Sequence, residues 1–188
     1  FVNREIGLFP PLGLMYIASY LMRDCSLEVK ILDALADRLD YGGIGAQIER
    51  YHPDILGVTA YTNNLLDVIA VANLAKEINQ DMHVCLGGPH VKVFPLEAIN
   101  LSSVDSVIPD AEEFVFSSLA KTIEQRKRLH EIKGLIFKDK GRIIDTGRAE
   151  PVDDLDSMPF PARNLLNPKN YNYILSKKIN ITTALTSR

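Results

Sequence analysis

The chain has 188 residues, of which 46% are hydrophobic and 24% are charged, with 10 Pro and 11 Gly. This composition is that of a globular protein of about one domain with a tail, and it excludes disordered, collagen-like, coiled-coil and disulfide-rich proteins. Lys and Arg number 21 against 24 Asp and Glu, so the net charge is −3 and we expect no nucleic-acid partner. The apolar runs are too short to predict a membrane span.

The predicted elements alternate along the chain. Leu14, Ile17, Ala18 and Leu21 repeat at the spacing of one buried helix face, and short β-branched runs that end in turn residues indicate strands. We expect helices over 12–22, 41–51, 65–79, 95–100 and 112–125, and strands over 28–33, 55–59, 83–88 and 104–108. Strands that alternate with helices predict an α/β protein with a Rossmann-like (flavodoxin-like) doubly wound parallel sheet.

Two segments near the end of the chain have a different character. Residues 134–146 contain two β-branched runs around Asp139-Lys140-Gly141, which predicts a β-hairpin that packs on the sheet edge. Residues 150–161 are acidic and rich in proline, so they cannot form a central strand and are predicted to be a linker.

An open parallel sheet binds ligands beyond the carboxyl ends of its strands. The loops predicted there are 3–11, 33–39, 59–64, 87–91 and 109–113. Packing alone can explain Gly87-Gly88 as a tight turn. Thr62 or Asn63 can serve as the cap of the next helix, but the two hydroxyls and two amides of 59–64 are equally consistent with the polar lining of a ligand site. We interpret His90 as a loop histidine, and we identify no catalytic residues and no metal site. Cys25 and Cys85 form no CxxC motif, so two reduced core thiols in a cytoplasmic protein are expected.

Together these loops resemble a known family. Residues 9–21 are similar to the "PPLGLxYLAxYL" opening of the cobalamin-binding domains of radical S-adenosylmethionine enzymes. The later segments follow in family order, and they include "VxxLD" at 29–33, "DxxGxS/T" at 54–59, "GGPH" at 87–90, "VDxVxxGEGE" at 104–113 and "xPxPAR" at 158–163. The last residues, 182–188, resemble the strand that leads into the cysteines of the iron–sulfur cluster, so we expect the chain to be part of a longer protein.

The resemblance implies a division of the chain and a set of ligand contacts. It implies a cobalamin-binding domain over 1–130, a hairpin extension over 131–150, and a linker with the start of the radical SAM barrel over 151–188. The 4Fe-4S cluster and S-adenosylmethionine would belong to that missing barrel, which would be the domain's partner in the same chain. The residues implied to contact cobalamin are Asn3, Gly7, Asp33, Ala34, Thr59, Tyr61, Thr62, Gly87, Gly88, Pro89, His90, Asp110 and Glu112.

The implied role is to position cobalamin for methyl transfer or for ring formation, as in anaerobic magnesium-protoporphyrin IX monomethyl ester cyclase. Gly87 and Gly88 would let the nucleotide tail pass, so a bulky residue at Gly88 is expected to abolish cobalamin binding and to leave the fold intact.

The sequence departs from related patterns at two places. Residues 3–7 lack the histidine that binds cobalt in mutases, and Asp110-Ala111-Glu112-Glu113 lacks the glycines of "GEGE". One alternative is therefore a cofactor-free scaffold or docking domain of the same family. Another is a receiver-like signalling domain, although Thr59-Ala60 stands where its phosphorylated Asp should be.

Overall fold

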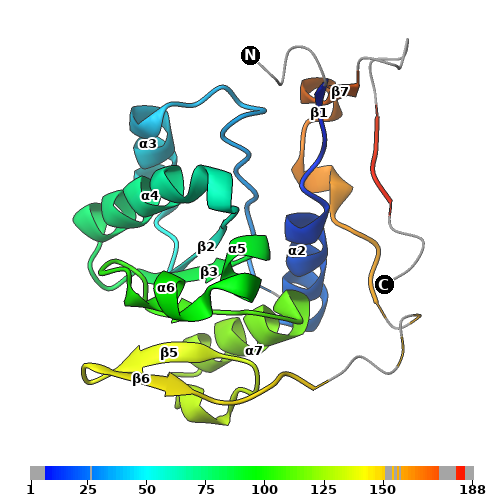
Figure 1. Cartoon of the computed structure of the whole chain (residues 1–188). Helices are drawn as coiled ribbons and strands as arrows, with labels where there is room; N and C mark the ends of the chain where they lie inside the picture. Colours follow the sequence, from blue (N-terminus) through cyan, green and yellow to red (C-terminus); the bar gives the residue numbers. More distant parts are fainter. Residues whose placement is uncertain are drawn as a thin grey trace. The chain divides into compact units, whose positions relative to one another are not determined.

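The structure, a computed structural model, describes residues 7–25, 27–150, 154, 156, 158–173 and 181–184 (Figure 1). The chain divides into two compact units. The smaller unit combines residues 1–39 with residues 156–188, and the larger unit contains residues 40–155. The domain boundaries predicted near residues 130 and 150 stay a prediction.

The larger unit is built on a five-stranded sheet of order β2-β3-β4-β5-β6. The pairs β2–β3 and β3–β4 are parallel, whereas β4–β5 and β5–β6 are antiparallel. The strands are β2 (Ile55–Thr59), β3 (His83–Gly87), β4 (Ser106–Val107), β5 (Ile136–Asp139) and β6 (Arg142–Asp145). The predicted Rossmann-like α/β fold is confirmed, and the predicted hairpin extends the parallel strands into a mixed sheet.

The helices of the larger unit are α3 (Tyr41–Tyr51), α4 (Leu65–Ile78), α5 (Pro89–Val93), α6 (Pro95–Asn100) and α7 (Glu112–Glu124), with short 3-10 turns at Thr62–Asn64 and Leu129–Glu131. Helices α3, α4, α6 and α7 lie close to their predicted positions, whereas α5 lies where a loop was predicted over 87–91. Helices α3 and α4 lie side by side (Figure 1). The strand predicted over 104–108 is shorter than expected, because only Ser106 and Val107 pair with both neighbouring strands.

Helices cover both faces of this sheet. Cys85 of β3 packs in one hydrophobic cluster with Val115 and Leu119 of α7. Since side chains alternate along a strand, Val84 and Leu86 face the opposite side, where both are fully buried. Helices α4 and α6 contact β2 and β4, respectively. Since helices cover both faces, the sheet is open at the two ends of its strands. We call these the carboxyl edge, where the parallel strands end, and the amino edge, where they begin.

The hairpin forms as its sequence predicts. Asp139 pairs with Arg142, so a two-residue turn joins β5 to β6. Lys140 and Gly141 both have positive φ, at 48° and 78°. Two positive φ values are characteristic of the type I′ turn, whose twist matches that of the flanking strands.

The smaller unit has a core of its own around α2 (Leu12–Asp24). Met15 and Ala18 of α2 pack with Ile31 and with Ala162, whose backbone N–H also donates to the carbonyl of Met15 at 3.0 Å. The described segment 158–173, in the region predicted to be a linker and the start of the barrel, is therefore packed against the first helix at Ala162. It contains 3-10 turns at Arg163–Leu165 and Pro168–Asn170, and β7 (Asn172–Tyr173) pairs antiparallel with β1 (Gly7–Leu8).

Residues 28–33, which were predicted to be a strand, do not form one. Their burial alternates, with Val29 and Ile31 packed inward, but no described residue forms a ladder with them. A strand requires a hydrogen-bonded neighbour as well as an alternating pattern.

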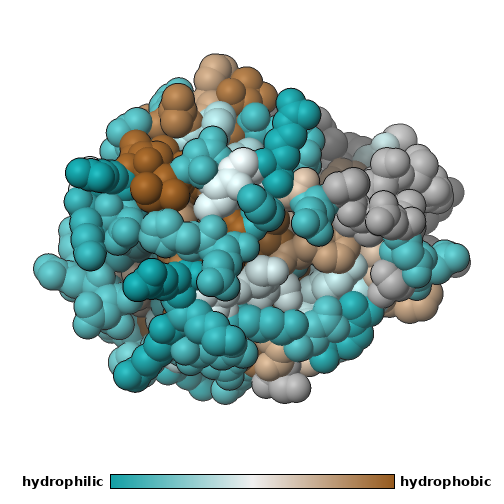
Figure 2. Space-filling model, turned by 90° about the horizontal axis from the view of Figure 1, so that it is seen from below, coloured by the Kyte–Doolittle hydropathy of each residue, from teal (hydrophilic) through white to brown (hydrophobic). Residues whose placement is uncertain are grey.

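The face of the molecule seen in Figure 2 is mostly polar. Seen from below, hydrophilic residues predominate and hydrophobic residues gather in small groups (Figure 2). Among the described residues, no helix combines the length and apolar character needed to cross a membrane.

Candidate functional site

Three loops of the larger unit begin where parallel strands end. They follow β2, β3 and β4, and parallel strands direct their carboxyl ends to one edge of the sheet. The first two loops are joined by their backbones, because Ala60 N–H donates to the Gly87 carbonyl at 2.8 Å and His90 N–H donates to the Ala60 carbonyl at 3.0 Å. The loops predicted over 59–64 and 87–91 are thus adjacent, and we call residues 59–62 and 87–90 the carboxyl-edge site.

Gly88 is required by the fold itself. Its φ of +97° with ψ near 180° is a conformation that almost only glycine adopts. A Cβ at this position would lie 2.9 Å from Thr59 Cγ2 and 3.0 Å from the Ala60 carbonyl oxygen. The expectation that a bulky residue at Gly88 leaves the fold intact is therefore wrong, since the clash is with the end of β2.

Gly87 has more space than Gly88. A Cβ there would meet Glu112 Cγ at 3.4 Å and the Ile108 carbonyl oxygen at 3.9 Å, which are ordinary contact distances. A substitution at Gly87, unlike one at Gly88, can therefore test whether a ligand needs this space, because its Cβ does not clash with the backbone.

His90 and Thr62 form a polar pair at this edge. Thr62 Oγ1 and His90 Nδ1 are 3.2 Å apart, and the His90 ring also packs on Phe94 with 5.4 Å between the ring centroids. His90 is only 2% exposed, and its Nε2 has no hydrogen-bond partner among the described residues. The interpretation of His90 as a loop residue is wrong, because it belongs to helix α5 and is buried.

The predicted cap of the helix after β2 is also wrong. Thr62 is engaged with His90, and the Asn64 side chain accepts a hydrogen bond from Tyr61 N–H at 2.8 Å. The neighbouring Tyr61 remains 49% exposed. Asn64, rather than Thr62 or Asn63, therefore satisfies the free N–H at the start of this turn, which leaves the Thr62 hydroxyl for the His90 pair.

The loop after β4 contains the predicted residues Asp110 and Glu112. Between them, Ala111 has a left-handed conformation with φ of +52° at the N-terminus of α7. Asp110 Oδ1 lies 3.3 Å from Lys92 Nζ of α5, and both side chains are well exposed. The Asp110–Lys92 pair connects the loops after β3 and β4 at the surface.

The remaining predicted residues belong to the smaller unit. Gly7 has φ of +107° and lies in β1, where a Cβ would come within 2.8 Å of Tyr173 Cα, and Asn3 lies outside the described residues. Asp33 accepts hydrogen bonds from Ala36 N–H and from the Tyr171 hydroxyl, both at 3.1 Å. Burial and the nearby Asp33 carboxylate raise the pKa of Tyr171 well above its usual range.

The hydrogen bond between Tyr171 and Asp33 was not predicted from the sequence. Tyr171 is 1% exposed and stands 138 residues from its partner Asp33, in a segment predicted to be a linker. Ala34, next to Asp33, is half-buried in the loop that Asp33 stabilises. The roles predicted for Asn3, Gly7, Asp33 and Ala34 stay predictions.

The part of the chain that the structure describes holds no group of three or more His, Cys, Asp or Glu residues placed to bind a metal ion. The carboxyl-edge site instead offers backbone groups, the hydroxyl of Thr62, a glycine, and the His90 Nε2 nitrogen, which no described residue pairs with. Such groups can hold and orient a polar ligand.

Comparison with known families identifies that ligand class. Residues 6–118 match the family model described as B12 binding domain, which is more than half of the chain. This match agrees with the family that the sequence motifs predict, and it does not favour the alternative of a cofactor-free scaffold.

Relatives of known name are similar along most of the chain. An uncharacterized methyltransferase of Pyrococcus horikoshii is 34% identical over 172 residues, covering 90% of this chain and 37% of the relative. The anaerobic magnesium-protoporphyrin IX monomethyl ester cyclase of Rubrivivax gelatinosus is 26% identical over 181 residues, covering 93% of this chain and 32% of the cyclase. The chain thus spans about a third of the length of these relatives.

Solved structures share the fold. The cobalamin-dependent S-adenosylmethionine radical enzyme OxsB, with aqua-cobalamin and S-adenosylmethionine bound, has a TM-score of 0.73 at 19% identity, covering 88% of this chain and 23% of OxsB. The radical S-adenosylmethionine methyltransferase TsrM from Kitasatospora setae, with cobalamin and a 4Fe-4S cluster bound, has a TM-score of 0.67 at 17% identity, covering 74% of this chain and 28% of TsrM.

Proposed function

Because the chain belongs to the B12-binding domain family, we propose that its carboxyl-edge site holds cobalamin and orients it for a reaction carried out with another domain. The observation that carries this proposal is that His90 Nε2 is buried with no hydrogen-bond partner among the described residues, while Nδ1 of the same ring pairs with Thr62. A buried polar atom without a hydrogen bond costs about 1–3 kcal/mol, and a polar group of a bound ligand recovers that cost.

The residues of the site divide this work between them. The backbone bonds between Ala60, Gly87 and His90 fix the loops before the ligand arrives, which lowers the entropy lost on binding. Gly87 leaves room for the cofactor's nucleotide tail. Thr62 presents its exposed hydroxyl, and His90 holds that hydroxyl through Nδ1.

The other predicted contacts complete the proposal. Tyr61 offers an exposed aromatic face, and Pro89 starts the short helix that carries His90. Asp110 and Glu112 would close the site from the loop after β4.

Cobalamin supplies a cobalt that can accept and transfer a methyl group, so this chain needs no catalytic residue of its own. We place the chain in a radical S-adenosylmethionine protein that methylates its substrate or forms a ring. The 4Fe-4S cluster and S-adenosylmethionine would be bound by the barrel domain of the same protein. This part of the proposal is supported by TsrM, which has cobalamin and a 4Fe-4S cluster bound, and by OxsB, which has aqua-cobalamin and S-adenosylmethionine bound. A cytoplasmic location belongs to this proposal, and it is supported by the absence of a disulfide at Cys25 and Cys85.

The test is a hydroxocobalamin titration followed by visible absorbance. His90→Gln should weaken binding about fivefold, the equivalent of about one hydrogen bond. Gly87→Leu should abolish binding while circular dichroism shows an intact fold. The matched control is His130→Gln. His130 is exposed and lies after the C-terminal end of α7, so this substitution should leave the cobalamin affinity unchanged. Equal affinity in all four proteins would contradict the proposed site.

A further inference from the structure

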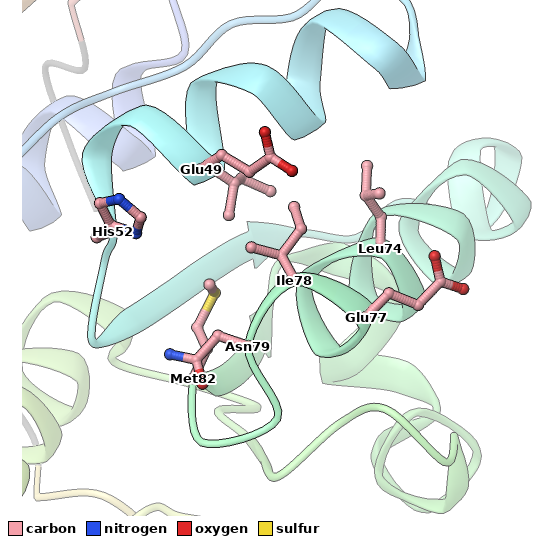
Figure 3. A pocket seen from close by; sticks show the side chains of 8 residues that line it. Glu49, His52, Leu74, Glu77, Ile78, Asn79 and Met82 are labelled. Atoms are coloured by element: carbon pink, nitrogen blue, oxygen red, sulfur yellow. The ribbon is translucent and has the colours of Figure 1, made fainter.

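A hollow, which we call the amino-edge groove, lies at the edge of the same sheet where the parallel strands begin. Helices α3 and α4 end there, and β3 begins there at His83, directly after Met82. The hollow has a volume of about 630 Å³ and is lined by residues from α3, from α4 and from the turn before β3 (Figure 3). This size lies within the range of small-molecule sites, which is roughly 300–1,000 Å³. Since parallel strands start at this edge, it is separate from the proposed cobalamin site.

The floor of this amino-edge groove is apolar. Ile48 is 4% exposed and Met82 is 1% exposed, while Leu74 and Ile78 are half-buried. Leu74 also packs over Gly45 of α3, where a Cβ would lie 3.4 Å from Leu74 Cδ2. The close approach of the two helices at Gly45 fixes the distance between the walls of the groove.

The walls are negatively charged. Glu49 of α3 and Glu77 of α4 line the groove, and Figure 3 shows Leu74 and Ile78 between them. Both glutamates are exposed, and the structure gives neither a salt-bridge partner among the described residues. The carboxyl ends of α3 and α4 add the partial negative charge of their last carbonyl groups.

No lysine or arginine lines the groove, and His52 is the one basic side chain among its lining residues (Figure 3). The nearby Lys76 is engaged elsewhere, because its Nζ lies 2.7 Å from Asp105 Oδ2 and donates to the Met82 carbonyl at 2.7 Å. The groove therefore combines two carboxylates on facing helices with an apolar strip between them.

We propose that this groove binds an aliphatic diamine. One ammonium group would pair with Glu49 and the other with Glu77, and the methylene chain would lie on Leu74 and Ile78. A ligand with one positive charge satisfies only one wall, and a small hydrated metal ion gains nothing from the apolar strip. The shape and charge of the groove thus select a cation with two charged ends and an apolar middle.

The test is a putrescine titration of the whole chain, followed by the methyl NMR signals of Met82 and Ile78. Putrescine should shift both signals saturably, and n-butylamine at equal ionic strength should bind about threefold more weakly, since each exposed ion pair contributes modestly. Glu49→Gln and Glu77→Gln should each weaken putrescine binding about threefold, and the double variant about tenfold. The matched control, Glu97→Gln on α6, should bind as the parent does.

Three results would overturn the proposal. These are a titration that does not saturate, an equal response to magnesium chloride, and an equal loss of affinity in Glu97→Gln. The titration is repeated with hydroxocobalamin present, and the putrescine affinity should not change. The two sites lie at opposite edges of the sheet. A negative putrescine titration therefore does not change the interpretation of the hydroxocobalamin titration, and the reverse also holds.

Discussion

Replacing Gly88 by alanine should destabilise the fold far more than the same replacement at Gly87. Gly88 has φ of +97° in a region that costs other residues about 1–3 kcal/mol. The new Cβ would also lie 2.9 Å from Thr59 Cγ2 and 3.0 Å from the Ala60 carbonyl oxygen. Forcing a methyl group into such a packed site costs about another 1–3 kcal/mol. The expected loss of unfolding free energy is therefore about 2–6 kcal/mol.

Gly87→Ala is the matched control for this experiment. Its Cβ would meet only Glu112 Cγ, at 3.4 Å, and the Ile108 carbonyl oxygen, at 3.9 Å. The change in unfolding free energy should stay within about 1 kcal/mol, since the reduced entropy of the unfolded chain offsets any slight crowding. Urea unfolding followed by far-ultraviolet circular dichroism measures both values. If Gly88→Ala unfolds within about 0.5 kcal/mol of Gly87→Ala, the argument that Gly88 is required for packing is refuted.

Two further predictions concern titratable groups of the larger unit, the half-buried His83 and the buried Cys85. Burial lowers the pKa of His83 below its usual 6.5, although Asp105 opposes this shift, so the unfolded chain takes up the proton first as the pH falls. The unfolding free energy should therefore decrease as the pH falls below about 6.5. This decrease should be smaller in His83→Gln. Parallel pH profiles of the unfolding free energy for the two proteins would contradict this account. Burial raises the pKa of Cys85 to about 12, so in the native protein at pH 8 Ellman's reagent should modify the half-buried Cys25 and leave Cys85 unmodified until urea is added. Equal modification rates in the native protein would show that Cys85 is accessible.

Periodicity predicted the helices well, because their buried faces depend on residues close together in the sequence. The apolar repeat at Leu14, Ile17, Ala18 and Leu21 lies in α2, which runs from Leu12 to Asp24. The same kind of pattern failed for the strand over 28–33. Alternating burial is a local property, whereas a strand depends on a partner that the local pattern does not specify.

The candidate site shows the same limit. The motif at Gly87-Gly88-Pro89-His90 was visible in the sequence, but the reason for its second glycine lies in Thr59 and Ala60, which the sequence places almost 30 positions earlier. The burial of His90 could not be predicted, because a five-residue helix has too few positions to show a repeat. The bond between Tyr171 and Asp33 joins residues 138 positions apart, and no pattern in either segment indicates it.

The most direct test of the central claim is to mix the purified chain with hydroxocobalamin, remove free cofactor by desalting, and record the visible spectrum of the protein. A chain that holds cobalamin at its carboxyl-edge site should retain the corrin bands, and Gly87→Leu should lose them while staying folded. A colourless protein with the circular dichroism of a folded α/β domain would contradict the proposed function.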